Sequence, residues 1–388
     1  MKKTKNLILF VLFAIFLCFG AAAIYVRPPA PQWRALVDSQ PPFGSVAAPQ
    51  FTATLLPQAA ASSHSSSVVV LRDGTRLAAW FAGSREGAGD VALVLSRQQN
   101  GLWSAPKAIQ TVAGVARAWR QYVKKIGNPV LFVAPNDDVH LVFVTVALGG
   151  WAGSRIAHSV SSDGGMNWSA PQLWITSPFM NISTLVRNPP LPIQMNHSRE
   201  PGWVLPVYHE FLRKFPEWVM LNQNGDMLAA AHIPVGRGLI QPALTALPDG
   251  SLRAYFRAAN KQQHIMAATY RNGWQAVAHP LALQNPNAAV AVVLMSDRRL
   301  LMAYNPSMDN RNRMALALSD DGERWTHVVD LEQGEAAAEF SYPALAVSGD
   351  NIDMTYTYLR QTIKHVRFNI AWLNATQNAQ QPSGTEHK

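Results

Sequence analysis

Six copies of one strand–turn–strand pattern follow one another along this chain, at a spacing of about 50 residues. Each copy begins with a polar residue, often followed by proline, and continues as an apolar strand, a turn and a second apolar strand. The copies begin at His64, Asn128, Asn188, Gln241, Asn287 and Tyr342. Because two-stranded units cannot bury both of their faces alone, they must pack on one another. The spacing is typical of propeller blades and predicts an all-β, six-bladed β-propeller of four-stranded antiparallel blades.

A second recurring motif supports the first. The pattern Ser-Asp-x-Gly-x-x-Trp, known as the Asp-box, occurs at residues 162–168 and 319–325. Its aspartate can accept backbone N–H bonds within a tight turn, its glycine supplies the positive φ, and its tryptophan packs against the blade. The motif is explained by turn structure, so we expect neither Asp163 nor Asp320 to be catalytic.

The first 26 residues predict a transmembrane anchor or a signal peptide. Lys2, Lys3 and Lys5 precede an apolar run of 20 residues, from Leu7 to Val26, which is long enough to span a bilayer. Positive charge ahead of such a run keeps the N-terminus in the cytoplasm. A cleaved signal peptide, with residues 21–23 as the cleavage region, is the alternative. The length favours an uncleaved anchor, and either reading predicts an extracytoplasmic body, periplasmic, on the cell surface or secreted.

The rest of the chain divides into three parts. Residues 27–50 contain two proline clusters and are predicted to form an extended linker. The repeats place the propeller at 51–372. The tail at 373–388 is polar and lacks periodicity, so it is predicted to be disordered.

Composition excludes several kinds of site. The single cysteine, Cys18, lies in the apolar run, so the body has neither a disulfide nor a cysteine metal site. The histidines lack metal-ligand spacing, and no glycine-rich phosphate loop occurs, so we expect no metal and no cofactor. No basic run resembles a nucleic-acid-binding stripe. The net charge of +9 is explained by a generic basic surface, and the partners it would favour are anionic polysaccharide or lipid.

Polar residues recur where the strands of each copy begin and end, opposite the turn. Six copies around an axis would bring these ends to one face and line a pocket there. The second-strand ends and the loop after the first of them add Arg85, Glu86, Asp90, His209, Glu210, Arg257, Asn305 and Arg360 to the six starting residues. Mixed acids, arginines and a tyrosine are what sugar chemistry uses. For each residue taken alone, strand capping or mutual pairing is the structural alternative.

These stretches resemble the sialidase-like Asp-box (BNR-repeat) superfamily of six-bladed propellers, and more closely its neuraminidase-like, BNR-repeat-like branch. The matching segments span nearly the whole repeat region, at residues 80–87, 128–131, 241–244, 285–287, 304–306, 339–343, 355–358 and 363–366. The resemblance implies cleavage of a terminal sialic acid by a tyrosine nucleophile, which a glutamate activates. It also implies an acid for the leaving group and three arginines for the substrate carboxylate.

Carried over by position, Tyr342 resembles the nucleophile, Glu210 its base, and Glu86 or Asp90 the acid. Arg257 and Arg360 would bind the anion. The remaining candidates for substrate binding are Arg85, His64, Asn128, Asn188, Gln241, Asn287, Asn305 and His209. One feature departs from the family, because its Arg-Ile-Pro motif at the first inner strand is replaced by residues 64–67, His-Ser-Ser-Ser. The sugar is therefore left open between sialic acid, another acid such as a uronate, and a neutral sugar.

Three functions follow from this pocket. The first is an exo-glycosidase with Tyr342 as nucleophile. The second is a polysaccharide lyase, in which Tyr or His abstracts a proton beside a uronate carboxylate and arginine stabilises the charge, with His64, His209, Tyr342 and Arg257 as candidates. The third is a non-catalytic propeller that binds polysaccharide. In all three the expected partners are a glycan and, through the N-terminal helix, a membrane.

Overall fold

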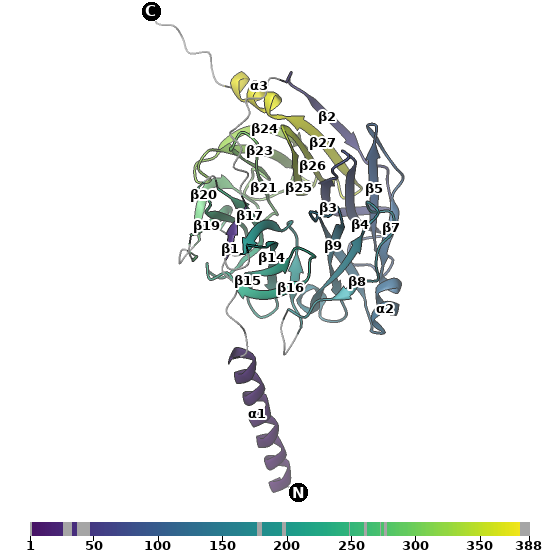
Figure 1. Cartoon of the computed structure of the whole chain (residues 1–388), viewed down its shortest axis with the longest axis vertical. Helices are drawn as coiled ribbons and strands as arrows, with labels where there is room; N and C mark the ends of the chain where they lie inside the picture. The colour runs from purple at the N-terminus through teal and green to yellow at the C-terminus, as the bar shows by residue number, and fades with distance from the viewer. Residues whose placement is uncertain are drawn as a thin grey trace, which may run out of the picture.

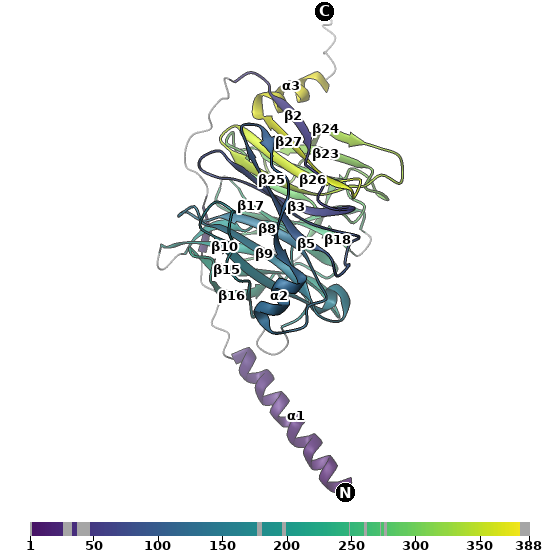
Figure 2. The ribbon, with the colours of Figure 1, turned by 90° about the vertical axis from the view of Figure 1, so that its right-hand side faces the viewer.

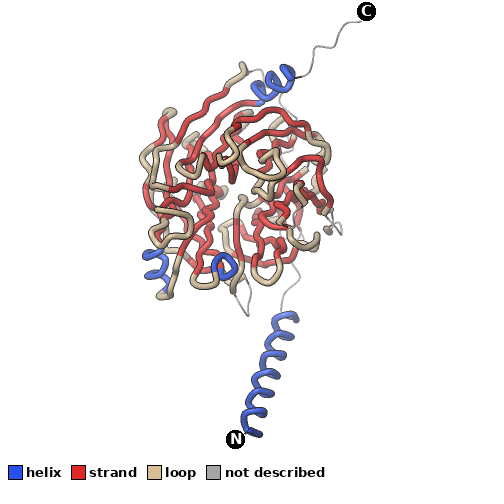
Figure 3. The backbone as a smooth tube through the Cα atoms, turned by 180° about the vertical axis from the view of Figure 1, so that it is seen from behind, coloured by secondary structure: helices blue, strands red, loops and turns tan. Residues whose placement is uncertain are grey.

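The computed structural model is a ring of six antiparallel sheets around a central axis (Figure 1). It describes residues 2–25, 33–36, 47–176, 181–195, 199–247, 249–259, 262–271, 273–274 and 278–380. Strands make up nearly all of the regular structure of this body (Figure 3). The six-bladed, all-β propeller predicted from the repeats is confirmed.

Each sheet is one blade, and the blades follow the chain in order. Blade 1 contains β3 (Ser62–Val70), β4 (Arg76–Gly83), β5 (Ala92–Gln99), β6 (Leu102–Trp103) and β7 (Lys107–Thr111). Blade 2 contains β8 (Lys125–Val133), β9 (Val139–Val146), β10 (Ser154–Ser161) and β11 (Gln172–Leu173). Blade 3 contains β12 (Thr184–Val186), β13 (Leu191–Met195), β14 (Pro201–Glu210), β15 (Lys214–Asn222), β16 (Met227–His232) and β1 (Trp33–Ala35).

The second half of the ring is more regular. Blade 4 contains β17 (Leu239–Ala246), β18 (Leu252–Ala258), β19 (His264–Tyr270) and β20 (His279–Gln284). Blade 5 contains β21 (Ala291–Leu294), β22 (Leu300–Tyr304), β23 (Arg313–Ser319) and β24 (Thr326–Gln333). Blade 6 contains β25 (Phe340–Ser348), β26 (Asn351–Tyr358), β27 (Thr362–Asn369) and β2 (Phe51–Leu55).

The ring is closed by a strand from the start of the propeller. β2 pairs antiparallel with β27, so that Phe51 lies opposite Phe368 in the last blade (Figures 1 and 2). A buried ion pair joins the same two ends of the ring, because Asp353 of β26 accepts hydrogen bonds from Arg76 of β4 at 2.7 Å and from His365 at 2.8 Å. β2 thereby covers β27, which would otherwise be the outer edge strand of the last blade.

Two segments outside the repeats differ from the sequence prediction. Trp33–Ala35, within the predicted linker, forms β1 on the edge of β13. The reason is its aromatic side chain, since Trp33 is buried between Trp218 and Tyr270, with ring centroids 5.0 and 5.1 Å away. The predicted disordered tail begins too early, because residues 370–380 form helix α3 (Ile370–Gln380), which buries Ile370 and Leu373. Residues 26–32, 37–46 and 381–388 lie outside the described part of the chain.

Three other helical segments flank the strands. They are α1 (Lys2–Tyr25), α2 (Val112–Trp119) and the 3-10 helix η1 (Gly150–Gly153). Across the part of the chain that the structure describes, no helix has the length and hydropathy of a membrane span. The anchor expected from the first 26 residues stays a prediction.

The Asp-box turns sit at the ends of β10 and β23. Asp163 accepts backbone N–H bonds from Met166 and Asn167, and the bond from Asn167 chiefly lowers the pKa of its carboxyl. In the second turn Asp321, not the expected Asp320, accepts the N–H groups of Glu323 and Arg324. The two adjacent aspartates could not be told apart by pattern alone. Both boxes therefore serve turn structure in the positions described.

We expect Gly165→Val to destabilise the protein by roughly 2–4 kcal/mol. Gly165 has a φ of +87°, and a Cβ there would lie 3.2 Å from Leu77 in a buried turn. Gly101, with a φ of +81° and no atom within 4 Å of its Cβ position, is the matched control that isolates backbone strain. Denaturant unfolding of both valine variants measures the difference. Equal losses would contradict the packing part of this argument.

Candidate active site

Backbone bulges on the inner strands aim the repeated polar residues at the axis. Five residues at the beginnings of the repeats have positive φ, namely Ser65, Asn128, Gln241, Asn287 and Tyr342. In blades 1, 2, 4 and 6 the strand register shifts at this point. A bulge of this kind re-aims a side chain and is common beside active sites. The bulged residue of blade 1 is Ser65, so the start at His64 was placed one residue early, because no proline marks the position there.

Tyr342 lies at the centre of the arrangement. Its phenol oxygen accepts hydrogen bonds from Gln241 Nε2 and from an Arg257 Nη1, each at 3.4 Å. Arg257 also donates to Gln241 Oε1 at 3.2 Å and to Asn287 Oδ1 at 2.7 Å. Tyrosine, arginine and two amides from blades 4, 5 and 6 thus form one network.

Two arginines beside Tyr342 differ in how their charge is balanced. Across the described residues, the hydrogen-bond partners of half-buried Arg257 are all neutral. Arg311 donates to the backbone oxygen of Asn287 at 3.1 Å and pairs with Glu339 at 3.3 Å, and its guanidinium lies 5.9 Å from the Tyr342 ring centre. Of these two arginines, only Arg257 lacks a carboxylate partner among the described residues.

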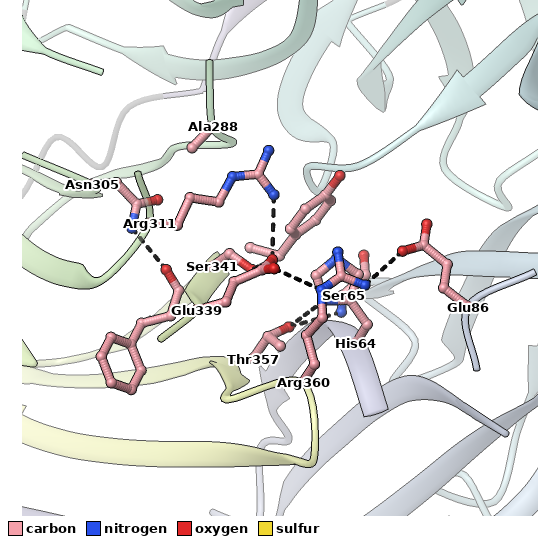
Figure 4. Close-up of polar contacts among 12 residues, drawn as sticks. His64, Ser65, Glu86, Ala288, Asn305, Arg311, Glu339, Ser341, Thr357 and Arg360 are labelled. Atoms are coloured by element: carbon pink, nitrogen blue, oxygen red, sulfur yellow. Dashed lines mark hydrogen bonds and ion pairs between the residues drawn. The ribbon is translucent and has the colours of Figure 1, made fainter. Parts of the chain in front are cut away.

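A chain of alternating charges borders this network (Figure 4). Arg360 donates to Glu86 at 2.8 Å and to Glu339 at 2.6 Å, and Glu339 continues to Arg311. Burial alone would raise the pKa of Glu339, but hydrogen bonds from Arg360 and Ser341 outweigh it and hold that pKa at about 2. Burial opposes the charge of Arg360, yet its two carboxylate partners raise the pKa of the guanidinium. The charge of Arg360 is therefore balanced by two carboxylates, those of Glu86 and Glu339.

The stability that Glu339 provides should depend on pH in a defined window. Its folded pKa of about 2 lies below the usual 4.5, so the contribution is present above pH 4.5 and is lost as the pH falls towards 2. We expect the difference in unfolding free energy between the wild type and Glu339→Gln to be constant from pH 5 to 7 and to shrink below pH 4.5. Denaturant unfolding across this range measures it, and a difference that grows on acidification would contradict it.

Two buried side chains, His64 and Arg187, lie against the ring of Tyr342. His64 packs against it edge-on, with centroids 4.4 Å apart, and its Nδ1 lies 3.0 Å from the Thr357 hydroxyl. Burial, followed by the charge of Arg360, lowers the pKa of His64 well below its usual value, so the ring is neutral at pH 7. Arg187 lies 5.1 Å from the Tyr342 ring centre and donates to the backbone oxygens of Ser66 and Pro343. Burial lowers the pKa of Arg187 to about 10.

Several of the expected site residues lie elsewhere. Glu210 ends β14, and its backbone N–H donates to the Ser183 hydroxyl; no hydrogen bond of its carboxylate to Tyr342 is found in the described structure. His209 turns away to bond Glu217 at 2.8 Å and to stack on Phe215. Arg85 and Asp90 are exposed, and Asp90 accepts hydrogen bonds from Ser84. Strand ends share a face, but the direction of each side chain depends on its loop.

Three of the asparagines expected in the site are buried within the protein. Asn305 bridges the backbone oxygens of Arg313 and Phe340 and is fully buried. Asn188 donates to the backbone oxygens of Gln241 and Pro242, and Asn128 is buried in its bulge. The side chains of Asn188 and Asn305 thus join neighbouring strands through backbone oxygens, as the capping alternative expects.

The structure also adds residues that the repeat pattern missed. Arg311 and Glu339 lie in loops outside the strand ends, and Arg187 and Tyr208 lie within apolar runs, so periodicity does not single them out. Arg187 directly precedes Asn188-Pro189, and Glu339 lies three residues before Tyr342-Pro343. Closeness to the starting residue of a repeat was the sequence feature that could have identified both. Within the described ranges no group of three or more His, Cys, Asp or Glu is suited to hold a metal.

Comparisons with known proteins agree with the propeller. The profile of the BNR repeat-like domain family matches residues 74–354. A search of curated proteins found no match. A Hadza microbial sialidase superposes with a TM-score of 0.65 at 14% identity, over 80% of this chain and 66% of the other. This chain thus spans just under two thirds of that protein's length.

Two further solved structures are similar. The intramolecular trans-sialidase from Ruminococcus gnavus, in complex with oseltamivir carboxylate, has a TM-score of 0.64 at 13% identity, over 82% of this chain and 97% of the other. Trypanosoma rangeli sialidase with 2,3-difluorosialic acid, a covalent intermediate, has a TM-score of 0.64 at 12% identity, over 91% and 60%. Identities this low show the fold. Together with the profile match across the blades, they lead to one assignment: the chain belongs to the BNR repeat-like domain family of sialidase-like propellers.

Proposed function

We propose that this protein is a glycan-active enzyme, an exo-glycosidase that removes a terminal acidic sugar with Tyr342 as its nucleophile. The observation that carries the proposal is Arg257, a half-buried guanidinium with only neutral hydrogen-bond partners in the described structure, in contact with the phenol oxygen of Tyr342. A partly desolvated charge without a counter-ion is costly unless a ligand supplies the anion. A sugar carboxylate would do so.

The two arginines beside the tyrosine define where that carboxylate binds. Arg257 and Arg311 come from adjacent blades, and both contact Asn287, one through its amide oxygen and the other through its backbone oxygen. Planar guanidinium groups bind carboxylates by paired hydrogen bonds. Arg360 is occupied by Glu86 and Glu339, so it supports the site rather than the substrate.

The chemistry follows from the sign of the substrate's charge. A tyrosine suits an anionic sugar, because a carboxylate nucleophile would be repelled by the substrate's own carboxylate. Arg257 and Gln241 both donate to the phenol oxygen and hold it in place for attack on the anomeric carbon. The acid for the leaving group is Glu86 or Asp90, of which Glu86 is connected to the site through Arg360.

One observation favours a second candidate, glycan binding without turnover. Tyr342 contacts the amide of Gln241, which cannot accept its proton. Glu210, the expected base, acts at most through Tyr208, whose hydroxyl accepts a hydrogen bond from Gln241. Burial chiefly raises the pKa of Tyr208, and the charge of Glu210 acts in the same direction. The lyase alternative is weakened, because His64 is buried and His209 is paired with Glu217.

A panel of glycans with terminal sialic acids, terminal uronates or neutral sugars separates these functions. The glycosidase releases a free acidic sugar. A lyase instead forms an unsaturated product that absorbs in the ultraviolet. Retained binding without any product supports the binding protein. Neither product nor binding with any acidic glycan would contradict the proposed pocket.

We expect Arg257→Leu to weaken binding of the acidic glycan by about 10- to 100-fold, because a charge-assisted pair of hydrogen bonds is lost. Binding of a neutral sugar should change much less. Arg324→Leu is the control, since Arg324 is 92% exposed in an Asp-box turn on the opposite side of the blade. Calorimetric titration of both variants measures the effect. An equal loss in the two variants would contradict a carboxylate site at Arg257.

We also propose that the propeller is extracytoplasmic and that its first 26 residues hold it at a membrane. The support is Lys2, Lys3 and Lys5 ahead of the apolar run. Protease treatment of intact and lysed cells tests the location. Digestion of the propeller in intact spheroplasts is expected, and protection until lysis would contradict it.

A further inference from the structure

An exposed apolar groove of about 720 Å³ lies between blades 2 and 3, on the loops that follow β9 and β14. Tyr122, Leu148, Ile175 and Phe211 line it, and exposed Leu212 follows Phe211 in the chain. Leu212 is 85% exposed, Leu148 74% and Tyr122 64%. Single exposed leucines are ordinary, but several large apolar side chains on adjoining loops mark an interaction surface. We call these five residues the docking patch.

The loops that carry the docking patch are strongly basic. Residues 117–125, 147–155 and 211–214 contain seven basic residues and no acidic residue, namely Arg117, Arg120, Lys124, Lys125, Arg155, Arg213 and Lys214. Five of the seven, all but Lys125 and Arg155, are exposed. The exposed apolar side chains of the docking patch are thus surrounded in sequence by basic residues.

The docking patch adjoins the face that holds Tyr342. The 3-10 helix η1 separates them: its Trp151 lies under Lys125, whose Nζ is 3.6 Å from the ring centre. A Cβ on Gly127 would lie 3.1 Å from Trp151 and 3.6 Å from Phe81, and Phe81 packs edge-on against His64. A surface that covered the docking patch would therefore lie beside the Tyr342 network.

We propose that the docking patch binds the surface of an anionic lipid bilayer. Apolar side chains at loop tips insert at the boundary of headgroups and acyl chains, and surrounding Lys and Arg bind lipid phosphates. Charge complementarity selects this occupant, because the basic residues around the apolar side chains match the negative charge of lipid headgroups. The contact differs from the N-terminal anchor, since it orients the propeller. It places the Tyr342 pocket at headgroup level, where glycans attached to lipids present their sugars.

A label at one side chain tests the contact directly. Cys18 is the only cysteine, so full-length Cys18→Ser with Leu212→Cys carries a single nitroxide. Leu102, a leucine that is 78% exposed and begins β6 in blade 1, is the matched control as Leu102→Cys. Both proteins are reconstituted in vesicles of phosphatidylglycerol with phosphatidylethanolamine, and in phosphatidylcholine. Accessibility of each nitroxide to lipid-soluble oxygen and to a water-soluble nickel complex is measured.

The expected result is lipid contact of the Leu212 label in anionic vesicles and aqueous exposure of the Leu102 label in both. Adding Arg213→Ser and Lys214→Ser should shift the docking equilibrium roughly 30-fold towards water, at about fivefold for each charge near an anionic surface. A Leu212 label that stays in water in anionic vesicles overturns the proposal. Spin–spin broadening between Leu212 labels, which shows a second copy of the chain on the patch, overturns it as well. Equal accessibility of both labels would show that the chain is held only by its N-terminal segment.

Discussion

Tyr342→Phe is expected to lower turnover of the acidic glycan by at least about 10³-fold while leaving the melting temperature nearly unchanged. The substitution removes only the phenol oxygen, which is the proposed nucleophile and the acceptor for Gln241 and Arg257. The ring remains, so its edge contact with His64 at 4.4 Å and its contact with Arg187 at 5.1 Å are retained. Steady-state kinetics and a thermal scan on the same preparation measure the two effects.

The binding constant of the variant adds a second criterion. Arg257 and Arg311 are unchanged, so the affinity for the acidic sugar should stay within a few-fold of the wild type. Loss of turnover with retained binding would place Tyr342 in the chemical step. Unchanged turnover would falsify the assignment of Tyr342 as nucleophile, and a large fall in melting temperature would show that the phenol oxygen serves the fold.

Asp353→Asn is expected to destabilise the propeller by about 3–5 kcal/mol, because it leaves buried partners of a charge pair without their counter-ion. The Asp353 side chain is 0% exposed and joins Arg76 of the first blade to His365 of the last. The pair lies at the junction where β2 closes the ring on β27. Denaturant unfolding with the chain intact measures the loss.

A surface pair between blades provides the control. Arg72 and Asp137 are 3.3 Å apart with side chains 73% and 50% exposed, so Asp137→Asn should cost less than about 1 kcal/mol. Asn also tolerates the positive φ of 68° at position 137. Similar losses in the two variants would contradict the view that burial makes the closing pair important.

The blades could be predicted from sequence because each repeat carries its own turn and two apolar strands. Register and closure follow from local rules once the count is known. β1 escaped prediction because its alternation covers only three residues within a proline-rich stretch, although Trp33 and Ala35 are both buried. α3 escaped because its polar composition hides two anchoring apolar side chains, Ile370 and Leu373.

Part of the site was also predictable from the repeats. Tyr342, Gln241, Asn287 and Arg257 lie on repeat positions, and the structure brings them together. Arg311 and Glu339 lie in loops whose course depends on neighbouring blades, so no local pattern marks them. His209 shows the converse, since a correct strand end did not determine where its side chain points.

Covalent trapping tests the central claim most directly. The protein is incubated with 2,3-difluorosialic acid and with the equivalent fluorinated uronic acid, and tryptic peptides are examined by mass spectrometry. The account predicts a sugar adduct on Tyr342 from at least one acidic probe, and none on that residue in Arg257→Leu at the same probe concentration. An adduct on a carboxylate, or no adduct with any acidic probe while the glycan is being hydrolysed, would contradict it.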